Sequence, residues 1–547
     1  MPTIAQRLRQ SYYASQAYHN KLRKHAYDGR RGVPPDPVGG NAADAAAICD
    51  GNFRLLERLM HLGDVPWNAP QVADRERERL HRFLFLDDLR ADGSEASRDK
   101  ARDLVMRWIT AHGRWHPLAW RSDVLGARLA AWLRAFSFVT DGAEERIAKS
   151  MDDSIRLQAA HLPRAVEAGN SGSVTFDAAE GLLTAGITLR GYEDLIDQGI
   201  TQLAKAIDTN VLADGCHMTG NPIIQIAALE RLLRIHAVLS AGQVPMPARL
   251  ISAIETMVPA IRTHLLGDGL LTRLNGCPEG DEATIKRVLA ASGLRAKAVM
   301  GLSRGGVSRL QCGQVTVVMD TGAAFAASRT PGGHAGLFAF EMSHRKKRII
   351  VNCGAHPDPR NPWHSSLRAT AAHSTVIIND TNAAPLGPDA AAAPMEDTQV
   401  IVRRNEHEGS QFVQAVHGGY RRLFAVSVSR EIYVSANGDD VRGRDSISFD
   451  EDILSGAKAP KPAEESAARF HLHPDVSVSQ TADGGFYLRA SPTAIWRFRS
   501  AGGTATLEDS VYVLDNGTVR RTQQIIVRAR LKPEPTTIKW SLRLENT

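Results

Sequence analysis

The spacing of hydrophobic residues divides the chain into two regions of different character. Between residues 41 and 300, apolar side chains recur every three or four positions, which is the spacing of amphipathic helices. The clearest segments are residues 103–112, 125–139, 176–190, 192–211 and 223–241. Gly, Pro and Asn residues separate them, and helices joined by such short loops pack as antiparallel pairs. The pattern therefore predicts an all-α region.

From about Val307 the pattern changes to short segments that are rich in β-branched residues and separated by Gly, Asn or Asp turns. Many short strands at regular spacing predict an antiparallel β-sandwich. We expect three parts: a basic N-terminal arm at 1–40, a helical domain at 41–300 and a β-sandwich at 301–547. The arm ends in a Pro- and Gly-rich linker, and a helix lying on the body of the protein is favoured over a partner contact.

Three of the predicted strands carry polar residues at their ends. They cover residues 337–342, 348–352 and 375–378. His334 precedes the first strand, Asn352 ends the second and His373 precedes the third. If the strands pair, two imidazoles and an amide can meet at one sheet edge and bind a divalent metal. Ordinary turn residues are the favoured alternative on spacing alone, because no HxH or CxxC motif accompanies them.

These strands carry a family resemblance. The segments HAGLFAFEMS, IIVNCGA and RATAAHSTVIIND follow one another along the chain. They resemble the C-terminal β-domain of the heparinase II/III-like polysaccharide lyases, whose usual form is roughly HxHADxLSFEL, LVDPGT and RxTxAHNTV. The segments DGCHMTGNPIIQIAALERLL and GDGLLTRLNG also resemble family segments, and the match covers nearly all of residues 100–530. The resemblance implies a helical α/α toroid followed by an antiparallel β-sandwich.

The resemblance implies a β-elimination chemistry, and this sequence departs from the residues that the family uses for it. The reaction removes the C5 proton of a uronate and expels the C4 oxygen, so it needs a neutralising group, a base and an acid. Ser173 and Val174 stand where the family has Asn and His, Ile224 where it has Tyr, and Gly332 where it has a further His. Asn170 could replace the family Asn only with a shift of three residues.

Other residues are candidates for these roles. His217 lies on a predicted loop before a helix, Asp177 stands where the family often has Glu, and Tyr420 lies in a predicted β-turn. With Asn170 they form the candidate catalytic set, although a capping His and a strand-edge Tyr are the favoured structural alternatives. The candidate substrate-binding residues are Arg273, Asn275 and Arg368. Arginine suits bidentate contact with carboxylates or sulfates, and pairing with an internal Asp is the alternative.

This sequence retains more of the family's metal-binding residues than of its catalytic residues. His334 and His373 match the family, and Asn352 replaces its Asp. The resemblance thus implies one structural Zn²⁺ bound by these three residues and no other cofactor. A neutral amide is a weaker ligand than a carboxylate, so we expect such a zinc to be weakly held.

The composition of the chain bears on whether its partner is a membrane, a polysaccharide or a nucleic acid. With 43% apolar and 23% charged residues, the chain resembles a soluble globular protein, and no apolar run is long enough to cross a membrane. The net charge of +6 suits an acidic polysaccharide, and no Lys/Arg tract indicates nucleic acid. Five widely spaced cysteines are not a disulfide scaffold. The N-terminus lacks an apolar signal region, which predicts a cytoplasmic protein, or a periplasmic one if the start is mis-set.

Three functions follow as hypotheses. The leading one is a lyase that cleaves an acidic, uronate-containing polysaccharide. The second is a protein that binds an anionic glycan without cleaving it. The third is an enzyme of altered chemistry on an exopolysaccharide or cell-envelope glycan, with His217 and Asp177 as its acid and base. The sequence leaves open the glycan, the cleavage mode and the oligomeric state, a homodimer included.

Overall fold

The structure is a computed structural model that describes residues 4–55, 58–168, 175–322, 332–386, 400–455 and 460–545. Its contacts form two compact units. The helical unit comprises Met1–Val211, Ala227–Glu255 and Lys286–Leu294, and the β unit comprises Leu212–Ile226, Thr256–Ile285 and Arg295–Thr547. The units therefore alternate along the chain, whereas the sequence predicts a single boundary near residue 300.

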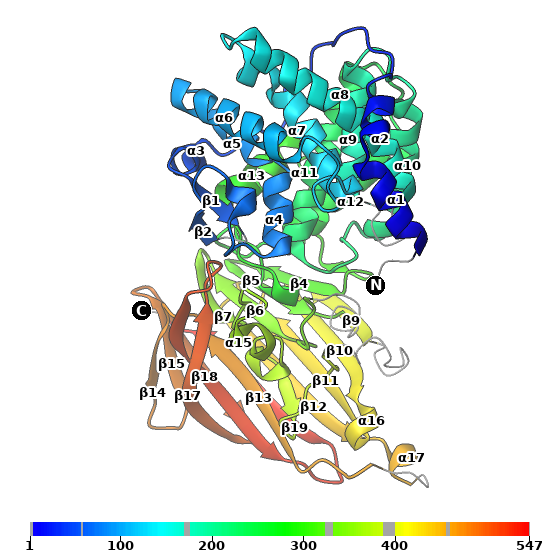
Figure 1. Cartoon of the computed structure of the whole chain (residues 1–547). Helices are drawn as coiled ribbons and strands as arrows, with labels where there is room; N and C mark the ends of the chain where they lie inside the picture. The colour runs from blue at the N-terminus through cyan, green and yellow to red at the C-terminus, as the bar shows by residue number, and fades with distance from the viewer. Residues whose placement is uncertain are drawn as a thin grey trace. The chain divides into compact units, whose positions relative to one another are not determined.

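The helical unit is built from amphipathic helices, coloured blue to green in Figure 1. Its helices are α1 (Ile4–Ala14), α2 (Gln16–Leu22), α3 (Ala42–Cys49), α4 (Asp74–His81), α5 (Phe85–Asp92), α6 (Glu95–His112), α7 (Ser122–Thr140), α8 (Glu145–Ala168), α9 (Phe176–Thr188) and α10 (Leu195–Asn210). The unit boundaries fall within the next three, α11 (Pro222–Ala241), α12 (Ala248–Thr263) and α13 (Glu282–Ala291). Strand β1 (Asn52–Leu55) pairs antiparallel with β2 (Arg58–His61).

Helix α9 lies at the centre of the helical unit. All of its residues are buried, including the charged residues Asp177 and Glu180. A helix that is covered on every side must provide each buried charge with a partner, because an unpaired charge in the interior is costly. We therefore expect basic side chains next to Asp177 and Glu180. Among the described residues, no helix is long and apolar enough to span a membrane.

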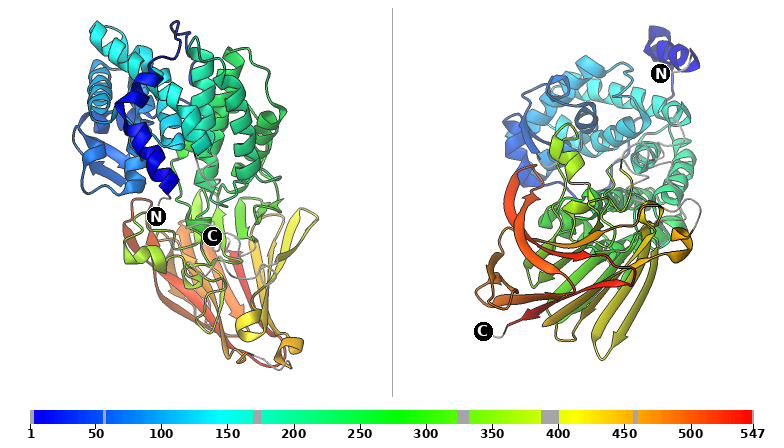
Figure 2. Two further views of the ribbon diagram at one scale, coloured as in Figure 1. Left: turned by 45° about the vertical axis from the view of Figure 1, so that its right-hand side comes forward. Right: turned by 90° about the horizontal axis from the view of Figure 1, so that it is seen from below.

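The β unit consists of two antiparallel sheets, which Figure 2 shows from two further directions. The eight-stranded sheet has the order β14 (Ser477–Gln480), β15 (Phe486–Ser491), β16 (Ala494–Ala501), β19 (Thr536–Leu544), β12 (Asp440–Phe449), β11 (Val426–Val434), β10 (Ser410–Tyr420) and β9 (Val400–His407). The other sheet has the order β17 (Thr504–Val513), β18 (Val519–Arg530), β13 (Glu465–Leu472), β7 (Lys347–Val351), β6 (Phe340–His344), β5 (Val315–Asp320), β4 (Val307–Cys312) and β3 (Gly301–Leu302), with β8 (Val376–Ile378) also paired to β13.

Aromatic residues from both sheets form the core of the β unit. Phe340 on β6 stacks on Trp540 of β19, with ring centroids 5.3 Å apart and an interplanar angle of 8°. Phe470 on β13 meets the same indole at 5.1 Å. Along β11 buried and partly buried residues alternate, as expected for a strand with one face on the core. The predicted fold class, a helical region followed by an antiparallel β-sandwich, is confirmed.

A buried ion pair lies within this core. Arg430 and Asp445 are both fully buried, and Arg430 Nε lies 2.6 Å from Asp445 Oδ1. Nη1 of Arg430 donates to the carbonyl oxygens of Phe338 and Ser374, at 2.9 and 2.8 Å. The pair therefore joins a strand of one sheet to the segments that lead into β6 and β8 of the other. Removing either charge would leave the other buried and without its partner.

Candidate functional site

Most of the predicted site residues lie in the β unit, where loops from four parts of its sequence approach one another. We call this region the polar cluster. It contains His217, Arg273, Asn275, His334, Asn352, Arg368 and His373. Each side chain is described below by the atoms it contacts, because those contacts decide which chemistry is available to it.

The two histidines of the polar cluster bond to each other. His334 Nδ1 lies 3.1 Å from His373 Nε2, and the rings meet edge to face. His373 Nδ1 lies 2.8 Å from the carbonyl oxygen of Ala369, which only accepts, so this nitrogen carries the proton. His373 Nε2 then accepts from His334 Nδ1. Burial lowers the pKa of His373 to about 4 and, with nearby cations, that of His334 well below its usual value. Both imidazoles are neutral.

Asn352 is occupied by internal hydrogen bonds. Its Oδ1 accepts from the backbone N–H of Ser374 at 2.9 Å, and its Nδ2 donates to Glu341 at 3.1 Å. The same Glu341 oxygen accepts from the backbone N–H groups of Asn352 and Arg273, both at 3.2 Å. The amide thus holds the end of β7 against neighbouring segments. Both of its functional atoms would have to leave protein partners before either could serve a ligand.

The three residues of the predicted zinc site are engaged with one another and with other parts of the protein. Two imidazoles bond to each other, the Asn352 amide is occupied, and no group of three or more His, Cys, Asp or Glu residues within the described ranges could hold a metal ion. Zinc in a structural site takes four protein ligands. The zinc prediction therefore gains no support from the structure.

Arg273 is an internal residue of the β unit. It is 1% exposed, and its Nη2 donates to the carbonyl oxygen of Val513 at 2.5 Å. Its guanidinium lies 3.4 Å from Asp515 and 3.7 Å from Glu279, with Cζ 4.7 Å from the centre of the Tyr512 ring. These partners neutralise its charge and cover its face. The contacts correspond to the alternative in which the arginine pairs with internal acids.

Asn275 connects two loops of the cluster. Its backbone has φ +51°, its Nδ2 donates to Gly220 O at 3.3 Å, and its carbonyl accepts from Asn221 Nδ2 at 3.2 Å. The next residue, Gly276, has φ +71°, and a Cβ there would lie 3.0 Å from His334 Nε2. Glycine is thus required both by the backbone and by the close approach of the loop to His334. The loop that contains His217 is in this way linked to the histidine pair.

His217 is neutral and 7% exposed. Its Nδ1 accepts from the backbone N–H of Thr219 at 3.2 Å and lies 2.9 Å from the hydroxyl of that residue. Because Nδ1 accepts, the proton is on Nε2. Burial lowers the pKa of His217 to about 4. A base with this pKa is poorly matched to proton transfer near neutral pH.

Arg368 keeps part of its surface accessible. It is half-buried, and its Nε donates to the carbonyl oxygen of Gly333 at 2.9 Å. Its own carbonyl oxygen accepts from Ala335 N–H at 2.9 Å, so the residue holds both sides of His334. Its guanidinium forms no ion pair with a carboxylate of the described residues. This arginine is therefore available to an anionic group in a way that Arg273 is not.

Tyr420 lies in the core of the β unit and away from solvent. It is 0% exposed, and its hydroxyl can donate to the carbonyl oxygen of Thr381 at 3.2 Å or of Val376 at 3.3 Å. Burial raises the pKa of Tyr420 well above its usual value. A proton on this hydroxyl is held by the backbone and cannot reach a bound glycan.

Asp177 belongs to the helical unit, at the N-terminal end of α9. Its Oδ2 lies 2.6 Å from Nη1 of Arg82, and its Oδ1 lies 2.9 Å from Nε of Arg231. Both carboxylate oxygens are thus engaged by arginines. Asn170, the remaining catalytic candidate, lies outside the described residues.

The described positions equivalent to the family's catalytic residues also carry no side chain that can transfer a proton. Ile224 is 36% exposed and has an apolar side chain, and Gly332 has none. Ser173 and Val174 lie outside the described residues.

Sequence reasoning missed a network of buried charges around α9. Arg134 contacts Glu180 and lies 3.1 Å from Asp87, and Arg234 lies 3.1 Å from both Asp36 and Asp87. Arginines lower the pKa of Asp36 well below its usual range, against the effect of burial. Two of these residues, Asp87 and Arg234, line a cavity of 410 Å³. A signal was present, because Asp177 and Glu180 on α9, and Arg231 and Arg234 on α11, repeat at a helical spacing of three.

A comparison with protein families finds a match for most of the β unit. Residues 295–541 match the family model described as Heparinase II/III-like, C-terminal. Over these residues the chain is similar to the heparinase II/III-like family. The resemblance seen in the sequence is thereby confirmed for this domain.

The whole chain is similar to proteins of two kinds. It is 28% identical over 550 residues to FtsZ-localized protein C of Caulobacter vibrioides, covering 97% of this chain and 93% of that protein. Heparinase III has the same fold, with a TM-score of 0.72 at 12% identity over 98% of this chain and 91% of that one. A mutant of heparan sulfate lyase HepC from Pedobacter heparinus gives 0.67 at 15% identity, over 97% and 88%. At these identities the two structures establish the fold alone: an α/α toroid followed by a β-sandwich.

Proposed function

We propose that this heparinase II/III-like protein binds an anionic glycan and does not cleave it by the family's β-elimination. The observation that carries the proposal is the state of the candidate acids and bases. Each described candidate is held in internal contacts: Tyr420 in the β-unit core, Asp177 between two arginines, and His217 as a neutral imidazole of low pKa.

β-Elimination requires a base on the C5 proton and an acid at the leaving oxygen, both within hydrogen-bond reach of the sugar. Tyr420 has no exposed surface, so it cannot touch a sugar without disruption of the core. Asp177 would have to give up two arginine contacts to accept a proton. Ile224 and Gly332 occupy family positions with side chains that transfer no proton.

Binding makes smaller demands than catalysis. An anionic glycan requires accessible cations and donors, and it needs no group whose pKa matches a proton-transfer step. Two features support this function: the net charge of +6, and the half-buried Arg368 of the polar cluster, which forms no ion pair with any residue that the structure describes.

The test measures cleavage and binding on the same sample. Purified protein is incubated with heparan sulfate, hyaluronan and alginate, absorbance of the unsaturated uronate is followed, and retention is measured on affinity gels that contain each glycan. We expect a flat absorbance trace and retention on at least one gel. A rise that disappears in His217→Ala, but persists in a control at the exposed His407, would overturn the proposal and establish a lyase.

Two other outcomes also count against it. Release of new chain ends without an unsaturated product would favour the enzyme of altered chemistry, with His217 and Asp177 tested as its acid and base. If the protein neither cleaves any of the glycans nor is retained on any gel, the proposal that it binds an anionic glycan is wrong.

A second candidate function concerns cell division and rests on the similarity over nearly the full length to an FtsZ-localized protein. We propose that this chain also associates with FtsZ. Purified protein is sedimented with FtsZ polymers assembled with GTP, and with unassembled FtsZ as the control. We expect it to pellet with the polymers only. Recovery in the supernatant in both cases would contradict the association.

A further inference from the structure

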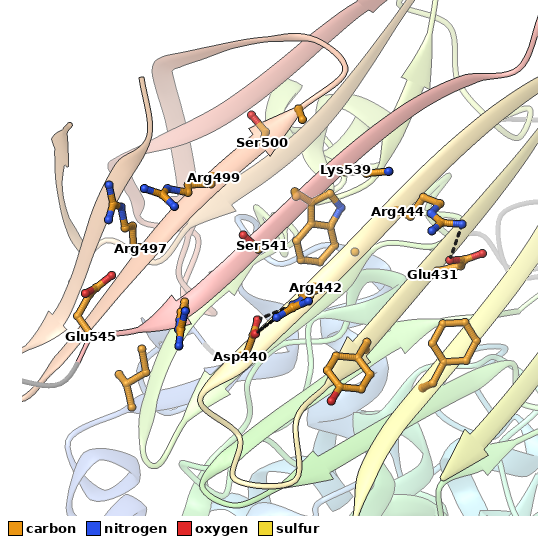
Figure 3. Close-up of a pocket in the computed structure, with 17 residues that line it drawn as sticks. Glu431, Asp440, Arg442, Arg444, Arg497, Arg499, Ser500, Lys539, Ser541 and Glu545 are labelled. Atoms are coloured by element: carbon orange, nitrogen blue, oxygen red, sulfur yellow. Dashed lines mark hydrogen bonds and ion pairs between the residues drawn. The ribbon is translucent and has the colours of Figure 1, made fainter. Parts of the chain in front are cut away.

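A broad groove lies on the eight-stranded sheet of the β unit, at a place separate from the polar cluster. Its volume is 900 Å³, and strands β10, β11, β12, β16 and β19 contribute to it (Figure 3). The lining contains six cationic and three acidic side chains, a net charge of +3. The cations are Arg442, Arg444, Arg497, Arg499, Lys539 and Arg543, and the acids are Glu431, Asp440 and Glu545.

The charged residues share one face because they alternate along each strand. On β19, Lys539, Ser541 and Arg543 face the groove, and the residues between them, Trp540 and Leu542, are buried in the core. The same alternation places Arg442 and Arg444 of β12, and Arg497 and Arg499 of β16, on the groove side, as Figure 3 shows. The groove is therefore the face of the sheet that does not pack on the other sheet.

The register of these strands places like charges opposite each other. Arg497 of β16 is the cross-strand partner of Arg543, and Arg444 of β12 is the partner of Lys539. Like charges at directly opposed positions destabilise a sheet. One member of each pair has an acid on its other side, because Asp440 is the partner of Arg543 and Glu431 is the partner of Arg444. An anion bound between the two cations of a pair would relieve the repulsion that remains.

The acids of the region only partly compensate these charges. Asp440 is paired with Arg442 at 2.6 Å, and Glu431 lies 3.6 Å from Arg444. Asp483 is shared by Arg497 and Arg499, at 2.8 and 2.9 Å. Lys539 and Arg543 form no ion pair within the part of the chain that the structure describes. The surplus positive charge is thus concentrated along β19.

The floor of the groove depends on a glycine. Gly443 of β12 is the cross-strand partner of Trp540, and a Cβ at this position would lie 2.1 Å from the indole ring. The indole fills the space of the missing side chain, and its Nε1 donates to the buried Asp445 at 3.1 Å. The cationic side chains therefore stand on a well-packed surface.

We infer that this groove binds a segment of an anionic polysaccharide, whose carboxylates or sulfates lie between the opposed cations. The inference rests on the proposed glycan-binding function and assigns a site to it. Along β19 the two like-charge pairs are four residues apart, which corresponds to about 14 Å in a strand. A polymer that carries anionic groups at intervals along its length can satisfy both pairs.

The chemistry of the groove favours a glycan over the other anionic polymers. Its face lies over central strands whose backbone groups are already paired, so it offers an acidic peptide no main-chain partners. Within the described ranges, none of the exposed large hydrophobic residues lines it, and a lipid surface would require such residues. Guanidinium groups together with the hydroxyls of Ser500, Ser541 and Tyr433 suit a ligand rich in both anions and hydroxyls.

The experiment compares two double variants that lose the same charge. The groove variant is Arg497→Gln with Arg543→Gln, which removes one like-charge pair. The control is Arg521→Gln with Arg530→Gln, two exposed arginines of β18 in the other sheet. Affinity for heparan sulfate and for alginate is measured at low and moderate salt, with neutral dextran as a further probe. We expect at least tenfold weaker binding for the groove variant and less than a twofold change for the control.

The possible failures can be told apart. If the wild type binds no anionic glycan, the proposed function fails and this inference fails with it. If the wild type binds and the groove variant equals the control, only the inference is overturned. Binding of polyglutamate or anionic vesicles, but not glycans, through the groove would overturn the ligand class. Thermal melts verify folding. The variant Lys539→Glu, which cancels the net charge of the second pair, provides an independent variant with the same expected loss.

Discussion

Asp320 at the end of β5 gives the stability of the β unit a specific dependence on pH. The residue is 9% exposed, and its carboxylate accepts from Gly322 N–H at 2.9 Å. Burial raises the pKa of Asp320 from 3.8 to about 7. A carboxyl whose pKa is raised by folding favours the folded state only while it is protonated. Its effect on stability is fully favourable below the pKa of the unfolded chain and is lost as the pH rises through about 7.

The magnitude follows from the size of this pKa shift. Three pKa units correspond to a loss of about 4 kcal/mol in the free energy of unfolding, of which about 2–3 kcal/mol falls between pH 5 and 8. Asn at position 320 has nearly the same shape, can accept the same hydrogen bond and does not ionise. We expect Asp320→Asn to gain stability relative to the wild type by that amount as the pH rises from 5 to 8.

The assay is urea unfolding of both proteins at pH 5 and at pH 8. Burial also raises the pKa of Asp88 in the helical unit to about 7, but that residue is present in both proteins and cancels in the comparison. A difference between wild type and variant that is equal at the two pH values would refute the assignment of a raised pKa to Asp320.

Three further predictions concern the same unit. Arg430→Met leaves Asp445 buried without its partner, and we expect a loss of about 3–5 kcal/mol in urea unfolding; a loss below about 1 kcal/mol would mean that the pair is dispensable. Gly443→Ala places a Cβ against the indole of Trp540, so we expect a lower melting temperature and altered tryptophan fluorescence, whereas an unchanged spectrum would contradict the close packing. Zinc or a chelator should leave the melting temperature unchanged; a zinc-specific increase that is lost in His334→Ala would show that a site forms.

The fold could be predicted because hydrophobic residues recur at a different spacing in each of the two regions. The helical spacing of residues 103–112 and the short alternating strands after Val307 both correspond to elements of the structure. The juxtaposition of His334 and His373 also followed from their positions at strand ends, and these residues do lie together. What the sequence could not supply was the set of partners, because the hydrogen bonds of the Asn352 amide come from residues far away along the chain.

The direction in which a side chain points was also difficult to predict from the sequence. The register of β10 shifts between His417 and Tyr420, so Tyr420 faces the core where strict alternation from His417 would place Gly419. The groove was missed for a related reason. Its cations repeat at every second residue on β12, β16 and β19, but these strands are neighbours only in space, and no pattern along one strand reveals the like charges opposite it.

The central claim is that a heparinase II/III-like fold here binds an anionic glycan without β-elimination. The most direct measurement follows the absorbance of unsaturated uronate and the retention on the matching glycan gel, with one preparation of the wild-type protein. We predict retention that weakens with salt, together with an absorbance trace that stays flat over hours. A steady rise in absorbance that scales with protein concentration would contradict it.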